Sequence, residues 1–173
     1  MYSIGSNGLY QFEDDLHKIA PHCEIHTFDF GRFARPNDYL KYHQYGLKSS
    51  YYPSYRVPGA SKTFQEILKE LGHENRTIDL FKIDCEGCEW VTFEDWITHD
   101  IRQVQIEVHG LPGTSVGGYM PVNRQQPVSP TALYERFTKE HFALFEKELN
   151  PYNTNCYELA YIKMAPEFWE TTG

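Results

Sequence analysis

Hydrophobic residues in this chain recur with two periods, one typical of strands and the other typical of helices. Short apolar or alternating segments predict strands over residues 2–4, 24–28, 45–47, 78–83, 103–108, 142–149 and 155–163. Apolar residues at helical spacing predict helices over residues 8–20, 61–71, 88–97 and 129–140. Because helices separate most of the strands, the pattern predicts an α/β fold with a doubly wound, mostly parallel sheet. The last two strands, joined by a polar turn, predict a C-terminal antiparallel hairpin.

Residues at the ends of these segments support the assignment. Pro21 ends the first predicted helix, while Ser61 and Gly72 are suited to cap the two ends of the second. The segment 31–58, rich in Tyr, Pro, Gly and Ser, is predicted to be mostly loop. The segment 110–130, rich in Gly and Pro, is predicted to be a long loop of the kind that covers an active site.

The length of 173 residues suits one domain spanning residues 1–173, and 40% hydrophobic residues are enough for a packed core. The first predicted strand begins at the second residue, so we expect the domain to be truncated at its N-terminus. No signal peptide or membrane span is recognisable in the sequence. A cytoplasmic location, without contact to a membrane, is therefore the default expectation.

The net charge of −8, from 16 basic and 24 acidic residues, bears on the choice of partner. A chain with this charge has no general attraction for the phosphate backbone of a nucleic acid or for an anionic membrane. We therefore expect a small-molecule partner and not a nucleic acid.

The four cysteines, Cys23, Cys85, Cys88 and Cys156, are predicted to be free thiols, because a chain of this length and hydrophobicity needs no disulfide framework. Cys85 and Cys88 form a Cys-x-x-Cys pair, which leaves a redox pair and a metal site as alternatives. A tetrahedral zinc site needs four ligands, and no second cysteine pair accompanies this one. The Glu-Gly sequence between the two cysteines is also unlike that of a thioredoxin-type pair.

Polar or glycine-rich residues lie at the ends of four of the predicted strands. They are Gly5–Gly8, Asp29, the segment 84–87, and Glu107 with His109. Open parallel sheets bind their ligands outside the carboxyl ends of the strands. The sequence therefore predicts a binding site at this edge of the sheet.

The first two of these groups predict a nucleotide-type cofactor. A turn of small residues between strand and helix, here Gly5-Ser6-Asn7-Gly8, lets a ligand approach the backbone closely. A carboxylate that ends the second strand, here Asp29, is placed to accept hydrogen bonds from ribose hydroxyls. An ordinary turn between strand and helix, with Asp29 capping the turn that follows it, is the alternative.

The remaining groups carry carboxylates and one imidazole. Asp84 and Glu86 could be loop carboxylates held by backbone amides at the start of the next helix. Glu107 lies within an otherwise apolar strand, where a carboxylate is unfavourable unless it is paired or solvated. Asp84, Glu107 and His109 would also suit a metal site made of hard oxygen ligands and one imidazole. The interpretation that we adopt assigns no metal.

The segments 2–8, 25–29, 79–90 and 105–109 together resemble the methyltransferase-like domain related to FkbM-type class I S-adenosylmethionine-dependent methyltransferases. The most specific part is a Lys-x-Asp-x-Glu-Gly-x-Glu segment, matched here by Lys82, Asp84, Glu86, Gly87 and Glu89. The resemblance spans nearly the whole chain. It implies a Rossmann-like, seven-stranded fold and S-adenosyl-L-methionine as the cofactor.

The resemblance also implies roles for single residues. Gly5, Ser6 and Gly8 would line the methionine and ribose portions of the cofactor, and Asp29 would hold the ribose hydroxyls. Asp84 and Glu86 would face the sulfonium and the acceptor. Asn7 stands where the family commonly has glycine, and asparagine tolerates the left-handed backbone conformation better than most residues.

These inferences together predict a methyltransferase that acts on oxygen in a small or carbohydrate-like acceptor. An acceptor hydroxyl needs a base, for which His109 or Glu107 is the candidate, with Asp84 orienting it. The alternatives are a nicotinamide-dependent oxidoreductase, a metal-assisted variant of the same transfer and a catalytically inactive nucleotide-binding module.

Overall fold

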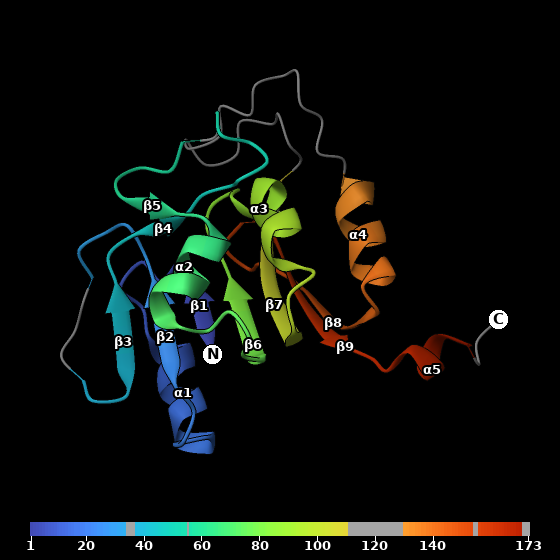
Figure 1. The fold of residues 1–173 in the computed structure, drawn as a ribbon, viewed down its shortest axis with the longest axis horizontal. Coiled ribbons are helices and arrows are strands. Elements are labelled where there is room, and N and C mark those ends of the chain that lie inside the picture. The colour runs from blue at the N-terminus through green and yellow to red at the C-terminus, as the bar shows by residue number, and fades with distance from the viewer. Residues whose placement is uncertain (34–36, 55, 111–129, 154–155, 171–173) are drawn as a thin grey trace.

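A seven-stranded sheet in the order β3-β2-β1-β6-β7-β9-β8 forms the centre of the computed structural model, which describes residues 1–33, 37–54, 56–110, 130–153 and 156–170 (Figure 1). The strands are β1 (Tyr2–Ile4), β2 (Ile25–Phe28), β3 (Leu40–His43), β6 (Ile78–Ile83), β7 (Ile101–His109), β8 (Phe142–Leu149) and β9 (Cys156–Lys163). Within this sheet, strands β1, β2, β3, β6 and β7 are parallel to one another. Strand β9 is antiparallel to both β7 and β8. The fold is therefore mixed α/β with a mostly parallel sheet, as predicted.

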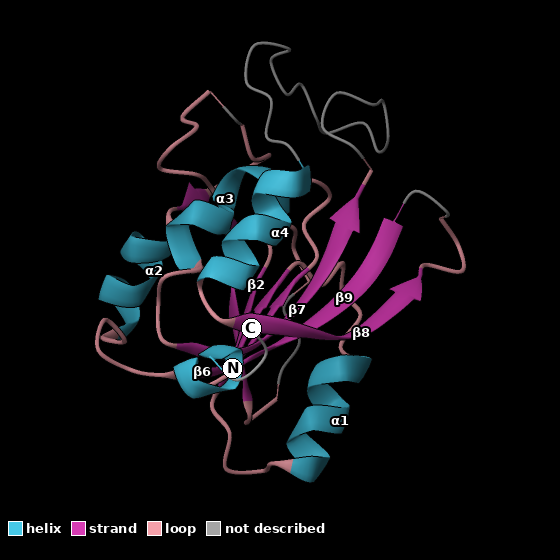
Figure 2. Ribbon diagram, turned by 90° about the vertical axis from the view of Figure 1, so that its right-hand side faces the viewer, coloured by secondary structure: helices cyan, strands magenta, loops and turns pink. Residues whose placement is uncertain are grey.

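The helices are α1 (Gln11–Ile19), α2 (Phe64–Leu71), α3 (Glu89–Trp96), α4 (Pro130–Lys139) and α5 (Pro166–Glu170). Helices α1 to α4 pack apolar residues against the sheet in two clusters, whereas α5 has no buried residue. The larger cluster combines Phe64 of α2, Trp96 of α3 and Phe137 of α4 with residues of the central strands. The smaller cluster contains Ile25 of β2, and the half-buried Leu16 of α1 packs against it. Figure 2 shows α2, α3 and α4 together on one side of the sheet and α1 apart from them.

The start of α2 differs from the prediction. Its N-cap is Thr63, whose side chain accepts a hydrogen bond from the backbone of Glu66 while the Glu66 side chain accepts one from the Thr63 backbone. The predicted cap, Ser61, lies instead in β5 (Ser61–Lys62), which pairs with β4 (Gly46–Leu47) in a separate two-stranded sheet. Pairing with β4 extends the chain there, so the helix begins later. Gly72 ends the helix in the left-handed conformation, as predicted.

Strand β3 was not predicted, since segment 31–58 was assigned mostly to loop. It pairs with β2 at the edge of the main sheet, and only Leu40 among its residues is buried. An edge strand with one buried residue leaves little periodicity in the sequence. The predicted strand at 45–47 lies in the small sheet as β4 and not in the main sheet.

Most other predictions agree with the structure to within a few residues. Helix α1 begins at Gln11 and not at residue 8, because the preceding residues form a turn. Helix α5 was not predicted. The predicted loop over 110–130 falls almost entirely on residues 111–129, which lie outside the described residues. In the part of the chain that the structure describes, no helix has the length and apolar character needed to cross a membrane.

Candidate active site

The turn after β1 is packed against the backbone at the end of β6. Gly5, Asn7 and Gly8 all have positive φ angles, of 83°, 46° and 75°. A Cβ atom added to Gly5 would lie 1.7 Å from the backbone oxygen of Asp84. Position 5 therefore requires glycine for two reasons, its backbone conformation and the lack of space.

Asp29, directly after β2, holds this turn through hydrogen bonds. Its Oδ2 atom accepts hydrogen bonds from the backbone N–H groups of Ser6 (2.9 Å) and Asn7 (3.0 Å), and from the Ser6 hydroxyl (3.3 Å). Its Oδ1 atom accepts one from the backbone N–H of Gly31 (2.8 Å). The carboxylate is buried. It thus fixes the turn after β1 and also caps the bend that follows β2.

A second group of side chains gathers where β6 and β7 end, and we call it the β6–β7 cluster. Its members are Asp84, Glu86, Glu89, Glu107 and His109. The parallel pairing of Ile83 with Ile106 brings the ends of the two strands together. Glu107 and His109 lie two residues apart in β7 and therefore share a face of the sheet.

His109 is at the centre of the β6–β7 cluster. Its Nδ1 lies 3.0 Å from Oε1 of Glu89, and its backbone N–H donates to the same oxygen at 2.8 Å. Its Nε2 faces Glu86 at 3.4 Å, Glu107 at 3.7 Å and Asp84 at 3.8 Å. Glu89 therefore orients the ring so that Nε2 points at three other carboxylates.

The turn between β6 and α3 carries two of the acidic residues of the cluster, Asp84 and Glu86. Glu86 and Gly87 both have positive φ angles, and the Gly87 N–H donates to Oε2 of Glu89 at 2.9 Å. Cys85 and Cys88 are joined by a disulfide bond across this turn, which brings their Cα atoms to 5.4 Å. The prediction of free thiols is therefore wrong for this pair.

Burial and charge shift the pKa values in the β6–β7 cluster. Burial lowers the pKa of His109, but the hydrogen bond and charge of Glu89, together with Glu107 and Glu86, outweigh it and raise the value to about 9. Burial, Asp84 and Glu158 raise the pKa of Glu107 to about 7, although Asn150 donates a hydrogen bond to it at 2.8 Å. With its pKa at about 9, the imidazole of His109 is mostly protonated at neutral pH.

A cavity of about 370 Å³ opens beside the cluster. This size falls within the range of small-molecule sites, about 300 to 1,000 Å³. Its lining includes five carboxylates and one lysine, which are Asp84, Glu107, Glu146, Glu148, Glu158 and Lys82. Neither the turn at 5–8 nor Asp29 is among the described residues that line it. The cavity therefore lies on the β7–β9 side of the turn.

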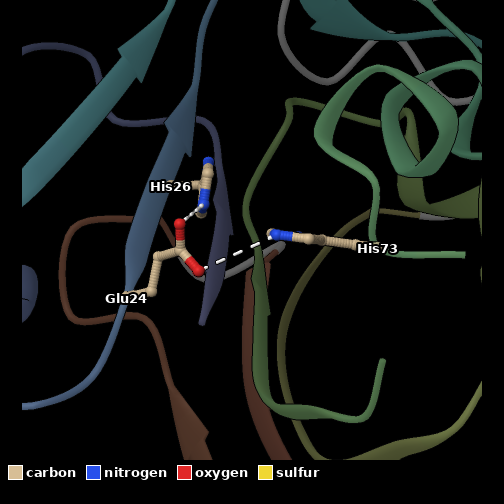
Figure 3. Close-up of side chains that lie close together, drawn as sticks. All are labelled: Glu24, His26 and His73. Carbon is tan, nitrogen blue, oxygen red and sulfur yellow. Dashed lines mark ion pairs between the residues drawn. The ribbon is translucent and has the colours of Figure 1, made fainter. Parts of the chain in front are cut away.

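Glu24, His26 and His73 form a third group (Figure 3). Glu24 directly precedes β2 and His73 lies between α2 and β6, so the group is at the opposite ends of the strands from the β6–β7 cluster. His26 Nε2 lies 3.2 Å from Glu24, and His73 Nε2 lies 3.8 Å from it. Lys41 and Arg76 both form ion pairs with the same carboxylate. Burial lowers the pKa of His26 to about 4. Sequence analysis missed this group, because His73 lies far along the chain from the other two residues.

A family model described as a methyltransferase domain matches residues 1–163 of the chain. The comparison found no match among curated proteins and none among solved structures. Since the family model covers nearly the whole chain, the protein belongs to this family of methyltransferase domains. Membership of the family implies a methyl-transfer function.

The structure brings the predicted site residues into two adjoining groups. Gly5, Ser6, Asn7 and Gly8 lie against Asp29, while Asp84, Glu86, Glu107 and His109 face one another. Their roles remain predictions. Sequence analysis did not assign a role at the site to Glu89, although it quoted this residue in the Lys-x-Asp-x-Glu-Gly-x-Glu segment.

Proposed function

We propose that this protein is an S-adenosylmethionine-dependent methyltransferase that methylates oxygen in a small or carbohydrate-like acceptor. Family membership supports the methyl-transfer chemistry. The sheet order and the helices on its two sides support a Rossmann-like, doubly wound fold. The observation that carries the proposal is the turn at 5–8, tied to Asp29 and packed against Asp84.

The cofactor would bind along this turn at the carboxyl ends of β1 and β2. A carboxylate offers about four acceptor positions, and Asp29 Oδ1 receives one hydrogen bond among those described. A ribose hydroxyl could therefore donate to Oδ1 while Oδ2 continues to hold the turn. The sulfonium and amino groups of the cofactor are cations, and the carboxylates around the neighbouring cavity favour them.

Methyl transfer depends mainly on alignment of the acceptor with the methyl group. The acceptor oxygen would form a bond to the methyl carbon as the carbon–sulfur bond breaks and its electron pair passes to sulfur. The hydroxyl proton would pass to Glu107, the candidate base that lines the cavity. Asp84 and His109 would hold the acceptor in position beside it.

Calorimetric titration of the whole chain tests the proposal. S-adenosylhomocysteine should bind with saturation, and NAD should not. The isosteric variant Asp29→Asn should weaken binding by about 10-fold or more, because it exchanges a charged acceptor for a neutral one. The exposed aspartate Asp38 provides the matched control, and Asp38→Asn should leave the affinity unchanged.

The same titration, together with an assay of methyl transfer, separates the alternatives. Binding of NAD without S-adenosylhomocysteine would overturn the proposal in favour of an oxidoreductase. Binding of S-adenosylhomocysteine without methyl transfer to any of a panel of sugars and small alcohols would favour an inactive binding module.

A further inference from the structure

His109 has a geometry that is typical of a metal ligand. One ring nitrogen is held by the buried carboxylate of Glu89, and the other points at Glu86, Glu107 and Asp84. Histidines that bind metals usually donate their second N–H group to such a carboxylate, which fixes the orientation of the ring. The side chain of His109 is 7% exposed, so its orientation is set by the protein.

The distances around Nε2 are longer than hydrogen bonds. They range from 3.4 to 3.8 Å, whereas an N–H···O hydrogen bond has a heavy-atom distance of about 2.7 to 3.2 Å. Ligand atoms that share one ion at about 2.1 Å lie roughly 3.0 to 3.5 Å apart. Asp84, Glu86 and His109 each offer one ligand atom within 4.8 Å of the others. The spacing is therefore close to that of a coordination sphere.

The charges of the cluster also favour a cation. Asp84, Glu86, Glu89 and Glu107 surround the single imidazole, and Glu158 pairs with Glu107 across β7 and β9. The lysine at this end, Lys82, lies 3.8 Å from Asp84. Several carboxylates packed closely are unfavourable without compensating positive charge. A divalent ion would supply it.

The geometry points to a binding site for a divalent first-row metal ion, formed by Asp84, Glu86 and His109 beside the acceptor position. Two carboxylates and one imidazole suit ions such as Mn²⁺ and Zn²⁺ better than Ca²⁺, which prefers oxygen ligands alone. The inference rests on the proposed function in one respect, because it gives the ion the role of binding and polarising the acceptor oxygen. Glu107, 3.7 Å from Nε2, would remain next to that oxygen.

Titration of the whole chain with Mn²⁺, followed by electron paramagnetic resonance without any cofactor, tests the metal site. One ion should bind per chain. The variant Glu86→Gln changes a side chain that is 60% exposed, so folding is preserved, and it should weaken Mn²⁺ binding by at least about 10-fold. Glu74→Gln, at an exposed glutamate elsewhere, is the matched control and should bind as the unaltered protein does.

Two outcomes would overturn the inference. One is the lack of saturable binding of Mn²⁺ and of Zn²⁺, Mg²⁺ and Ca²⁺ in parallel titrations. The other is binding that Glu86→Gln and Asp84→Asn both leave unchanged. Titration with S-adenosylhomocysteine in the presence of EDTA is independent of these results. Cofactor binding without metal binding would refute the metal site alone, and metal binding without cofactor binding would refute the proposed function alone.

Discussion

The β6–β7 cluster and the Glu24–His26–His73 group lie at opposite ends of the strands, and both place carboxylates beside buried imidazoles. They differ in their charge balance. The single carboxylate of Glu24 is paired with Lys41 and Arg76, whereas His109 and Lys82 face a larger number of carboxylates. Clustered ligand atoms alone therefore do not identify a metal site. The balance of charge around them separates a structural ion-pair network from a cation site.

The two buried histidines report this difference. Burial lowers the pKa of His26 to about 4, and the neighbouring His43 and His73 act in the same direction. For His109 the surrounding carboxylates outweigh burial, and its pKa rises to about 9. Similar burial thus gives opposite shifts, because only one of the two imidazoles lies among uncompensated negative charges.

The largest expected effect compares two glycines with positive φ angles, Gly5 in the turn after β1 and Gly72 at the end of α2. Gly5→Ala should destabilise the protein by more than about 3 kcal/mol and abolish binding of S-adenosylhomocysteine, because the new Cβ would overlap the Asp84 backbone at a positive φ. Gly72→Ala also has a positive φ but no atom within 4 Å, and should lose only about 1 to 2 kcal/mol. Denaturant unfolding and calorimetry measure both effects. Equal losses in the two variants would contradict the close contact at Gly5.

A second comparison concerns one histidine from each group. His109→Ala should lower methyl transfer by about 100-fold or more while S-adenosylhomocysteine binds as before, because the imidazole positions the acceptor. His73→Ala should retain the turnover of the unaltered protein, since His73 lies far from the carboxyl ends of the strands. Steady-state kinetics and circular dichroism of both variants provide the measurement. Unchanged turnover in His109→Ala would remove this residue from the mechanism.

The smallest expected effect is a pH dependence of stability from the Glu24–His26–His73 group. The pKa of His26 is lowered in the folded state, so the unfolded chain binds the proton first as the pH falls. The contribution of His26 is complete above the ordinary pKa of 6.5 and is lost as the pH falls towards 4.

Chemical denaturation between pH 4 and pH 7 measures this loss. The variant His26→Gln should show a flatter dependence over the same range. An equally steep dependence in the variant would assign the effect to other groups.

The pattern of apolar residues predicted six of the seven strands of the main sheet and missed only β3, at one edge. Strand β6 is an apolar run, and β7 alternates over most of its length, so both were recognised. Strand β3 depends on pairing with β2 and buries only Leu40, which leaves no periodic signal. The start of α2 was misplaced because pairing of Ser61 with Gly46 is a contact between distant segments.

The candidate site was predictable where topology alone brings residues together. Strand ends in a parallel sheet share an edge, so the proximity of Asp84, Glu107 and His109 followed from the order of elements. The contact between Glu89 and His109 could not be derived in this way. It depends on the path of the turn before α3, where Glu86 adopts a left-handed conformation.

The disulfide bond between Cys85 and Cys88 has a practical consequence for every measurement on this protein. It joins residues only three positions apart, so reducing it removes little of the constraint on the chain as a whole. It does, however, release the segment that carries Glu86. Samples prepared with dithiothreitol and samples prepared without it therefore hold two chemical forms that differ in the turn before α3, and assays become comparable only when the thiol status is fixed.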